Sequence, residues 1–241
     1  MTVSGKVVKQ INSIQEGTTF KYQQLDIKMD EYNAAAKAIE RLIERQIIKR
    51  VSTGVFYKPK KTEFGELRPK EEEIIKPYLF VKNKRIAYIT GTALYNQMGL
   101  TTQVPNTIKI ASKGKRISIK TGNIQAKPVK SYIDVTNDNF YLLELLDVLK
   151  DFKIIPDLDK KMAIKYILNK LEALSDKDKL RLMKFAIQYP PRTSAFLGAL
   201  LGNMNTNLDL KILKQNLNPL TDYKLGIKEN QLSTAPNWNI K

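Results

Sequence analysis

The sequence predicts an α+β protein: an N-terminal winged helix-turn-helix, followed by a mixed domain with a small sheet and a helical C-terminal part. Three observations support this prediction. Helical and β-prone patterns alternate over residues 1–62, short β-prone runs gather between about 86 and 135, and helical apolar periodicity dominates 140–217. We therefore expect two domains, a winged helix over residues 1–62 and a second domain over 63–241.

The first segment predicts a helix and a turn. Its apolar residues repeat with the spacing of one helix face: Val3, Val7, Val8, Ile11 and Ile14. The helix is expected to end near Gly17, in a turn at Glu16-Gly17, because glycine adopts the turn conformation at low cost. A short helical piece is then expected over residues 22–26.

The next pattern is a longer helix followed by a hairpin. We expect Asp30 as its N-cap, since a carboxylate accepts the unpaired N–H groups of a first turn. One face is apolar: Ala35, Ala38, Ile39, Leu42, Ile43 and Ile47. Residues 49–51 and 55–57 are β-prone and are joined by a turn ending in Gly54, and the run 58–61 with Pro59 ends the second strand.

A helix, a turn, a second helix and a basic two-stranded wing are typical of a DNA-binding domain. Such a helix presents polar side chains to base edges in the major groove, and wing cations contact phosphates. We expect Asn33, Lys37 and Arg41 in the groove. Residues expected to position the DNA backbone are Lys21, Gln23, Lys49, Arg50, Lys58 and Lys60. The alternative is a helical domain with a solvated basic face. Arg41 has a second alternative of its own, which is to pair with Glu44 or with a neighbouring helix and serve packing.

The second domain is expected to begin near Arg68-Pro69 with a helix from Glu71. A strand over 87–90 leads to a short helix that Gly99 closes. Three further strands are expected over 107–111, 116–120 and 123–127, the first two joined as a hairpin by residues 112–115. Five helices then follow, over 140–150, 159–173, 175–188, 191–201 and 208–217.

Three positions in the helical part have an expected local role. Asp159 and Ser175 are expected to start their helices. Gly198 allows close approach of another backbone, and we expect its helix to be a core helix rather than a docking helix.

The composition excludes several kinds of active site. The chain contains no Cys and no His, so it has no disulfide, thiol nucleophile, Ser-His-Asp triad or imidazole-bound zinc. Residues 112–115 lack the rest of a phosphate-binding P-loop. We expect no catalytic residue, metal or cofactor and no enzymatic activity. A carboxylate metal site built from distant acidic residues is the open alternative.

Two further features concern location and partners. The apolar run 195–201 is far shorter than the roughly 18 residues of a membrane span, and the N-terminus has no apolar leader segment. We therefore expect a soluble cytoplasmic protein that does not bind membranes. Residues 1–135 carry a net charge of +13 out of +17 for the whole chain, which favours a polyanion such as nucleic acid as partner.

Several blocks of residues resemble a known family. They are residues 38–42, 47–50 and 54–59, residues 91–94 with Gly99-Leu100-Thr101-Thr102-Gln103-Val104-Pro105, Tyr189-Pro190-Pro191-Arg192 through Leu201, and residues 217–226. The first group resembles the winged helix of AbiE-type antitoxins from type IV toxin-antitoxin (abortive infection) systems, and the second resembles that family's second domain. The C-terminal blocks resemble a subgroup common in Bacteroidetes-like bacteria.

The resemblance implies two functions. The winged helix is expected to bind double-stranded DNA at its own promoter as an autorepressor, and the second domain to counteract a nucleotidyltransferase toxin without needing a stable complex. Candidate partner-binding residues are Tyr95, Gln97, Gln103 and Arg192. One departure is Gln46 where the family commonly has Gly, which predicts a longer helix or a left-handed glutamine. The alternative is a winged-helix regulator with an effector-binding second domain and no toxin partner.

Overall fold

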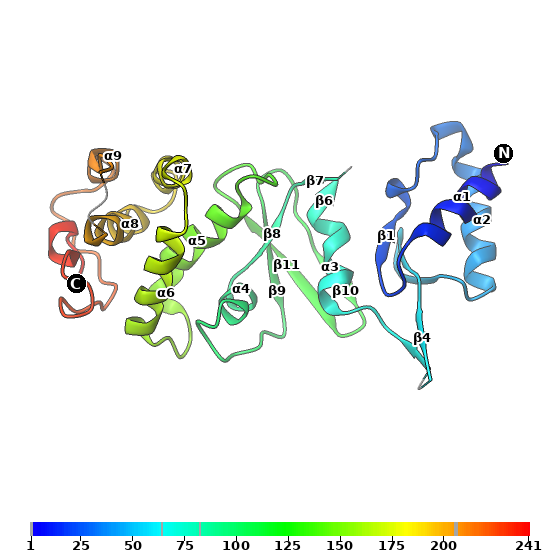
Figure 1. The fold of residues 1–241 in the computed structure, drawn as a ribbon, viewed down its shortest axis with the longest axis horizontal. Coiled ribbons are helices and arrows are strands. Elements are labelled where there is room, and N and C mark those ends of the chain that lie inside the picture. The colour runs from blue at the N-terminus through cyan, green and yellow to red at the C-terminus, as the bar shows by residue number, and fades with distance from the viewer. Residues whose placement is uncertain (1, 64, 82, 205–206) are drawn as a thin grey trace. The chain divides into compact units, whose positions relative to one another are not determined.

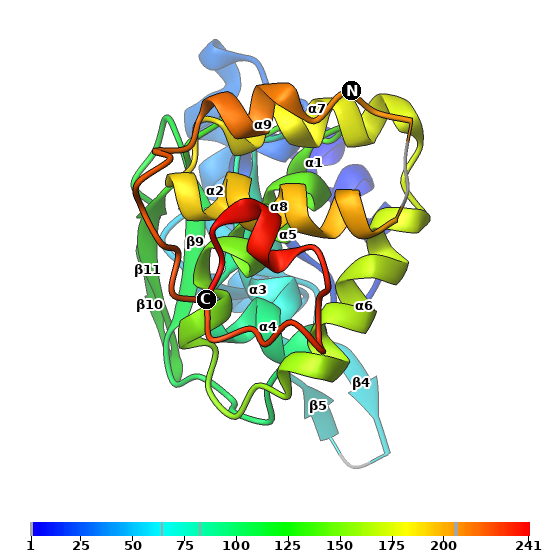
Figure 2. The same ribbon diagram turned by 90° about the vertical axis from the view of Figure 1, so that its left-hand side faces the viewer.

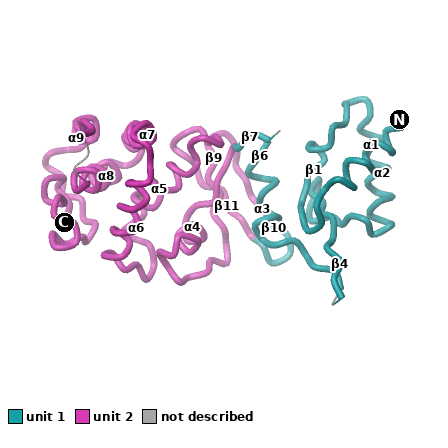
Figure 3. The backbone as a smooth tube through the Cα atoms, in the orientation of Figure 1, with its two compact units in different colours: residues 1–85, 120–124 teal, residues 86–119, 125–241 magenta. Residues whose placement is uncertain are grey.

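The structure is a computed structural model that describes residues 2–63, 65–81, 83–204 and 207–241. It has the predicted mixed α+β fold. Two compact units divide the chain, one made of residues 1–85 and 120–124 and the other of residues 86–119 and 125–241 (Figure 3). The first unit therefore includes the predicted winged helix and the segments that follow it up to Arg85.

The first unit begins with helix α1 (Val3–Ser13), strand β1 (Thr19–Lys21) and two 3-10 turns (Tyr22–Gln24 and Met29–Glu31). Helix α2 (Tyr32–Glu44) and the hairpin of β2 (Lys49–Ser52) and β3 (Val55–Tyr57) follow (Figure 1). The three strands form an antiparallel sheet in the order β1-β3-β2. Its core is apolar and comes from the helices and the sheet: Val7, Ile11, Phe20, Leu25, Ala35, Ala38, Ile39, Leu42, Ile48 and Phe56.

Four details of residues 2–57 differ from the prediction. Helix α1 ends at Ser13 with Ile14 as its C-cap, before the predicted end near Gly17. Strand β1 was not predicted, because three residues are too few to show an alternating pattern. Asp30 is not the N-cap of α2: it lies within the second 3-10 turn, and α2 begins only at Tyr32 without a side-chain cap. Ile47 is 38% exposed and Ile48 is fully buried, so the apolar stripe ends one residue later than predicted.

The backbone at Gln46 explains that shift. Gln46 has a left-handed backbone with φ of 57°, which confirms the second of the two expected outcomes at this position. Its N–H donates to the carbonyl of Ile43 (2.9 Å), and the N–H of Ile47 donates to that of Leu42 (2.9 Å). This pair of bonds is a Schellman motif, which ends α2 and turns the chain into β2.

The rest of the first unit consists of small elements. Two hairpins, β4 (Lys60–Thr62) with β5 (Gly65–Leu67) and β6 (Phe80–Val81) with β7 (Lys84–Arg85), flank helix α3 (Glu71–Leu79). The helix starting at Glu71 is as predicted, and the hairpins were not predicted. Their strands have only two or three residues, too few to carry a local pattern.

The second unit contains most of a four-stranded sheet. Strands β8 (Tyr88–Thr90), β9 (Ile108–Ser112), β10 (Ile119–Thr121) and β11 (Ile124–Lys130) have the order β10-β11-β9-β8. The predicted hairpin between the strands now identified as β9 and β10 is wrong: β9 pairs in parallel with β11, and residues 112–115 are not its turn. A parallel pair needs a crossover connection, and the segment 113–118 with β10 supplies it. Helix α4 (Thr92–Gln97) ends before Gly99, whose φ is +72° as a C-cap glycine requires.

The C-terminal helices are α5 (Phe140–Asp151), α6 (Lys160–Glu172), α7 (Asp176–Ala186), α8 (Pro191–Asn203) and α9 (Lys211–Gln215). The caps are as predicted: Asp159 accepts the N–H of Met162 (3.0 Å), and Ser175 accepts that of Asp178 (3.1 Å). The last helix is shorter than the predicted 208–217. None of the described helices is long and apolar enough to cross a membrane.

Helix α8 is a core helix, as predicted, with residues 193–201 all buried. A Cβ on Gly198 would lie 2.2 Å from Cζ3 of Trp238, so the close neighbour is an indole ring and not the expected backbone. Figure 2 shows the C-terminal segment that carries this tryptophan crossing in front of α8.

Candidate nucleic-acid interface

Helix α2 presents its predicted groove residues on one solvent face. Asn33, Lys37 and Arg41 are four residues apart and exposed, opposite the buried Ala38 and Leu42. Within the described part of the chain, Lys37 and Arg41 make no hydrogen bond or ion pair, so the alternative pairing of Arg41 with an acidic neighbour is not observed. Their charges are therefore available to an external anion.

This face is not purely basic. Glu40 and Glu44 are also exposed on α2 and point to the same side of the helix as Asn33 and Lys37. The two carboxylates balance the two cations, so the helix face alone does not create a strong positive potential. Non-specific attraction to a polyanion must come from other parts of the unit.

Strand β2 supplies two cations beside a cavity. Lys49 forms an ion pair with Glu66 of β5, and this hydrogen bond raises the pKa of Lys49. The Arg50 guanidinium lies 5.7 Å from the ring centroid of Phe56. Together with Arg68 and residues 121–124, both cations line a cavity of about 400 Å³. Positive groups around an open cavity suit the binding of a phosphate.

The other predicted backbone contacts occupy varied environments. The Lys21 ammonium lies 4.4 Å from the ring centroid of Tyr78, and Gln23 and Lys60 are exposed. The Lys58 ammonium donates to the carbonyls of Asn12 and Ile14, both at 3.2 Å. It therefore holds the C-terminal end of α1, where a cation also favours the helix dipole.

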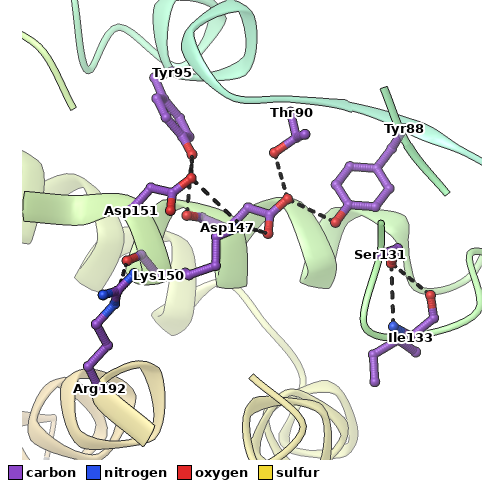
Figure 4. Close-up of polar contacts among 9 residues, drawn as sticks. All are labelled: Tyr88, Thr90, Tyr95, Ser131, Ile133, Asp147, Lys150, Asp151 and Arg192. Atoms are coloured by element: carbon purple, nitrogen blue, oxygen red, sulfur yellow. Dashed lines mark hydrogen bonds and ion pairs between the residues drawn. The ribbon is translucent and has the colours of Figure 1, made fainter. Parts of the chain in front are cut away.

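The predicted partner-binding residues separate into two pairs. The Tyr95 hydroxyl donates to Oδ2 of Asp151 (2.7 Å), and Nε of Arg192 donates to the carbonyl of Lys150 (3.1 Å). Both therefore meet at the last turn of α5 (Figure 4). Gln97 is exposed on α4, and Gln103 donates to Asp157 (3.2 Å), so neither joins this group.

The centre of this group is a buried carboxylate that the sequence reasoning missed. Oδ2 of Asp147 accepts the hydroxyls of Tyr88 (2.9 Å) and Thr90 (2.6 Å), and its Oδ1 pairs with the Lys150 ammonium (2.9 Å) (Figure 4). The Lys150 ammonium also lies 3.7 Å from Asp151. The available signal was that Asp147 lies among the apolar residues Leu145, Leu146, Val148 and Leu149 of α5, since a charge on a buried face needs a partner.

The electrostatics of this cluster follow from its burial. Burial and the neighbouring Asp147 raise the pKa of Tyr88 and of Tyr189 far above the usual range, and burial with Asp151 does the same for Tyr95. Burial alone would lower the pKa of Lys150, but Asp147 and Asp151 outweigh it and the pKa rises. The tyrosines therefore stay neutral and the lysine stays charged at neutral pH.

The Asp147 cluster connects several elements of the second unit. The described residues contain no group of three or more acidic side chains placed to hold a metal ion. The Asp147 cluster links β8, α4 and α5, and the last turn of α5 in turn holds Arg192 at the start of α8.

Comparison with known proteins identifies a family and a solved structure of similar fold. A family model of unknown function, DUF6088, matches residues 6–135. No curated protein matches the chain. The crystal structure of the RV2827C protein from Mycobacterium tuberculosis is similar in fold, with a TM-score of 0.54 and 11% identity over 100% of this chain and 91% of that chain. Because the family model covers more than half of the sequence, this protein belongs to the DUF6088 family.

Proposed function

We propose that this protein is an antitoxin of a type IV, abortive-infection toxin-antitoxin system that also represses its own promoter. The observation that supports DNA binding best is the face of α2 with Asn33, Lys37 and Arg41, whose cations have no partner within the described residues. Helix α2 follows α1 and precedes the basic wing formed by β2 and β3. This order of elements is the one that places a helix in the major groove.

The two parts of the first unit have different tasks in this proposal. Side chains on α2 contact base edges, and their balanced charge favours reading of sequence over general attraction. Lys49 and Arg50 of β2, with Arg68, contact phosphates beside the cavity of about 400 Å³. A dimer or a pair of monomers would bind an inverted repeat.

The second unit counteracts the toxin in this proposal. The support is the resemblance of Gly99–Pro105 and Tyr189–Arg192 to AbiE-type antitoxins. These segments adjoin α4 and α8, and Tyr95 and Arg192 meet at the last turn of α5. The expected toxin is a nucleotidyltransferase, which this unit opposes with or without a stable complex.

The test separates the two tasks in one set of strains. The adjacent reading frame is induced alone, with the wild-type chain, and with a Lys37→Gln/Arg41→Gln variant, and promoter binding is measured in parallel by mobility shift. We expect the variant to lose promoter binding while it still restores growth, because its substitutions lie on the exposed face of α2. A Lys177→Gln/Lys184→Gln variant removes two exposed charges from α7 and should retain both activities.

Two results would count against the proposal. Sequence-specific promoter binding by the α2 variant would overturn the assignment of the groove residues. A neighbouring reading frame that does not arrest growth would overturn the antitoxin function and leave a winged-helix regulator with an effector-binding second unit.

A further inference from the structure

The second unit contains a small cavity outside the residues proposed to bind DNA. The end of α5, the start of α8 and residues 222–225 enclose about 320 Å³. Small-molecule sites typically measure about 300–1,000 Å³, so the cavity has the volume of a site for one small ligand. Four cations line it: Lys150, Lys153, Arg192 and Lys224.

The cavity keeps a positive charge after its internal ion pairs are counted. Asp147 and Asp151 pair with Lys150, and Asp222, the carboxylate in the lining, pairs with Lys241 at 2.6 Å. Lys153 and Lys224 are exposed and make no ion pair with any residue that the structure describes. The lining therefore has four cations and one carboxylate, and Lys153 and Lys224 keep charges that no described ion pair balances, which favours an anionic ligand.

Arg192 is oriented before any ligand arrives. Its Nε donates to the carbonyl of Lys150 at 3.1 Å (Figure 4), and its two terminal nitrogens bond to no residue in the described part of the chain. These nitrogens form a planar fork that matches two oxygens of a phosphate. The carbonyl of Lys150 belongs to the last turn of α5, so the backbone of this helix sets the direction of the fork.

Part of the lining is apolar. Ile154, Tyr223 and Leu225 line the cavity, and Ile154 is 70% exposed. Tyr223 is held by two backbone bonds, one from its N–H to Asn239 (2.7 Å) and one from the N–H of Lys241 to its carbonyl (3.0 Å). An apolar surface beside a phosphate fork suits a ligand that carries both a phosphate and a ring.

We propose that this cavity binds a nucleoside phosphate. Its phosphates contact Arg192, Lys153 and Lys224, and its base or ribose packs against Ile154 and Tyr223. This binding does not involve the residues proposed to contact DNA, because every residue named here belongs to the second unit.

The test is titration calorimetry of the full-length chain with ATP, adenosine and tripolyphosphate. We expect ATP to bind more tightly than tripolyphosphate and adenosine not to bind. Arg192→Gln should lower the affinity for ATP about tenfold or more, because a charge-assisted hydrogen bond is lost. Lys153→Gln removes a side chain that forms no ion pair with any described residue and should weaken ATP binding in the same direction. Lys177→Gln on α7 should have no effect.

Three outcomes would overturn the proposal. They are absence of ATP binding by the wild-type chain, equal ATP affinity in the Arg192→Gln, Lys153→Gln and Lys177→Gln variants, and equal affinity for tripolyphosphate and ATP. If Arg192→Gln weakens the binding of a single-stranded oligonucleotide but not of ATP, the cavity binds a nucleic-acid strand instead. The Lys37→Gln/Arg41→Gln variant should bind ATP normally, which distinguishes this test from that of DNA binding.

Discussion

Single residues end helices and set distances in this fold. Gln46 adopts a left-handed backbone to close α2, and Lys58 holds the last carbonyls of α1. Gly198 lies under the indole of Trp238, where any side chain would overlap the ring. Each of these roles depends on one atom or one torsion angle, so each can be tested by one substitution.

We predict that Gly198→Ala destabilises the protein. The new Cβ would lie 2.2 Å from Cζ3 of Trp238, and the ring is buried, so the ring or the helix must move. Overpacking of this kind costs roughly 1–3 kcal/mol in the free energy of unfolding, measured by urea denaturation.

Gly202→Ala in the same helix is the matched control. Its Cβ would meet no atom closer than 3.8 Å, and alanine is favoured over glycine inside a helix by about 1 kcal/mol. Equal destabilisation of both variants would show that the contact with Trp238 is not the cause.

We predict that the free energy of unfolding falls as the pH rises above about 10. Unfolded tyrosine loses its proton near pH 10, whereas burial and Asp147 raise the pKa of folded Tyr88 far above that value. The unfolded state then binds fewer protons than the folded state, so alkali favours unfolding. Urea denaturation curves recorded at several pH values above about 10 give the slope of the unfolding free energy against pH. Tyr88→Phe should make this slope less steep by about 1.4 kcal/mol per pH unit.

Thr90→Val controls for the lost hydrogen bond. It removes another hydroxyl that donates to the same Asp147 oxygen but does not titrate. The variant should be less stable at every pH and keep the wild-type slope. A slope change as large as that of Tyr88→Phe would contradict the role given to the tyrosine.

At the scale of elements, α2 and β2 carry similar side chains in different settings. The exposed face of α2 mixes two cations with Glu40 and Glu44, whereas β2 places Lys49 and Arg50 beside a cavity with Arg68. In the proposed complex, α2 therefore contributes sequence preference and β2 contributes general affinity.

We predict different effects of Lys37→Gln and Arg50→Gln on promoter binding. Lys37→Gln should weaken binding to the specific site by about 1–3 kcal/mol, since it removes a base contact. Binding to non-specific DNA should change less. Arg50→Gln should weaken both and reduce the slope of log affinity against log salt by about 0.9, because one phosphate contact is lost. Fluorescence anisotropy over a salt series measures both quantities.

Lys9→Gln removes an exposed charge from α1, outside the proposed interface, and should change neither quantity. If Arg50→Gln leaves the salt slope unchanged, β2 does not contact the DNA backbone.

At the scale of the whole molecule, most of the net positive charge lies in the part of the chain up to residue 135. Residues 1–135 hold +13 of the net +17, and the DUF6088 match covers nearly the same stretch, residues 6–135. The helical part that follows is closely balanced in charge and builds its core from α5 to α8. Residues 1–135 cover the first unit and the sheet strands of the second, so this distribution favours polyanion contacts in the part of the chain before the C-terminal helices. The phosphate recognition proposed for the C-terminal helices depends instead on a few oriented side chains.

Most elements could be predicted from the sequence because their signals are local. The stripe on α2, the caps Asp159 and Ser175 and the glycine at 54 act within a few residues of themselves. Strands of two or three residues, such as β1 and β6, carry too few positions for such a signal. The face with Asn33, Lys37 and Arg41 was likewise predictable, since helical periodicity alone places these residues together.

The sequence by itself therefore determined the fold class, most of the helices and the exposed face of α2. Tertiary structure alone decided that β9 pairs in parallel with β11, that Asp147 collects its partners from β8 and α5, and that Arg192 reaches the end of α5. The reason is the range of the interactions. Helix periodicity, caps and turns depend on neighbouring residues, whereas strand order and the partners of a buried charge depend on groups that only the folded chain brings together.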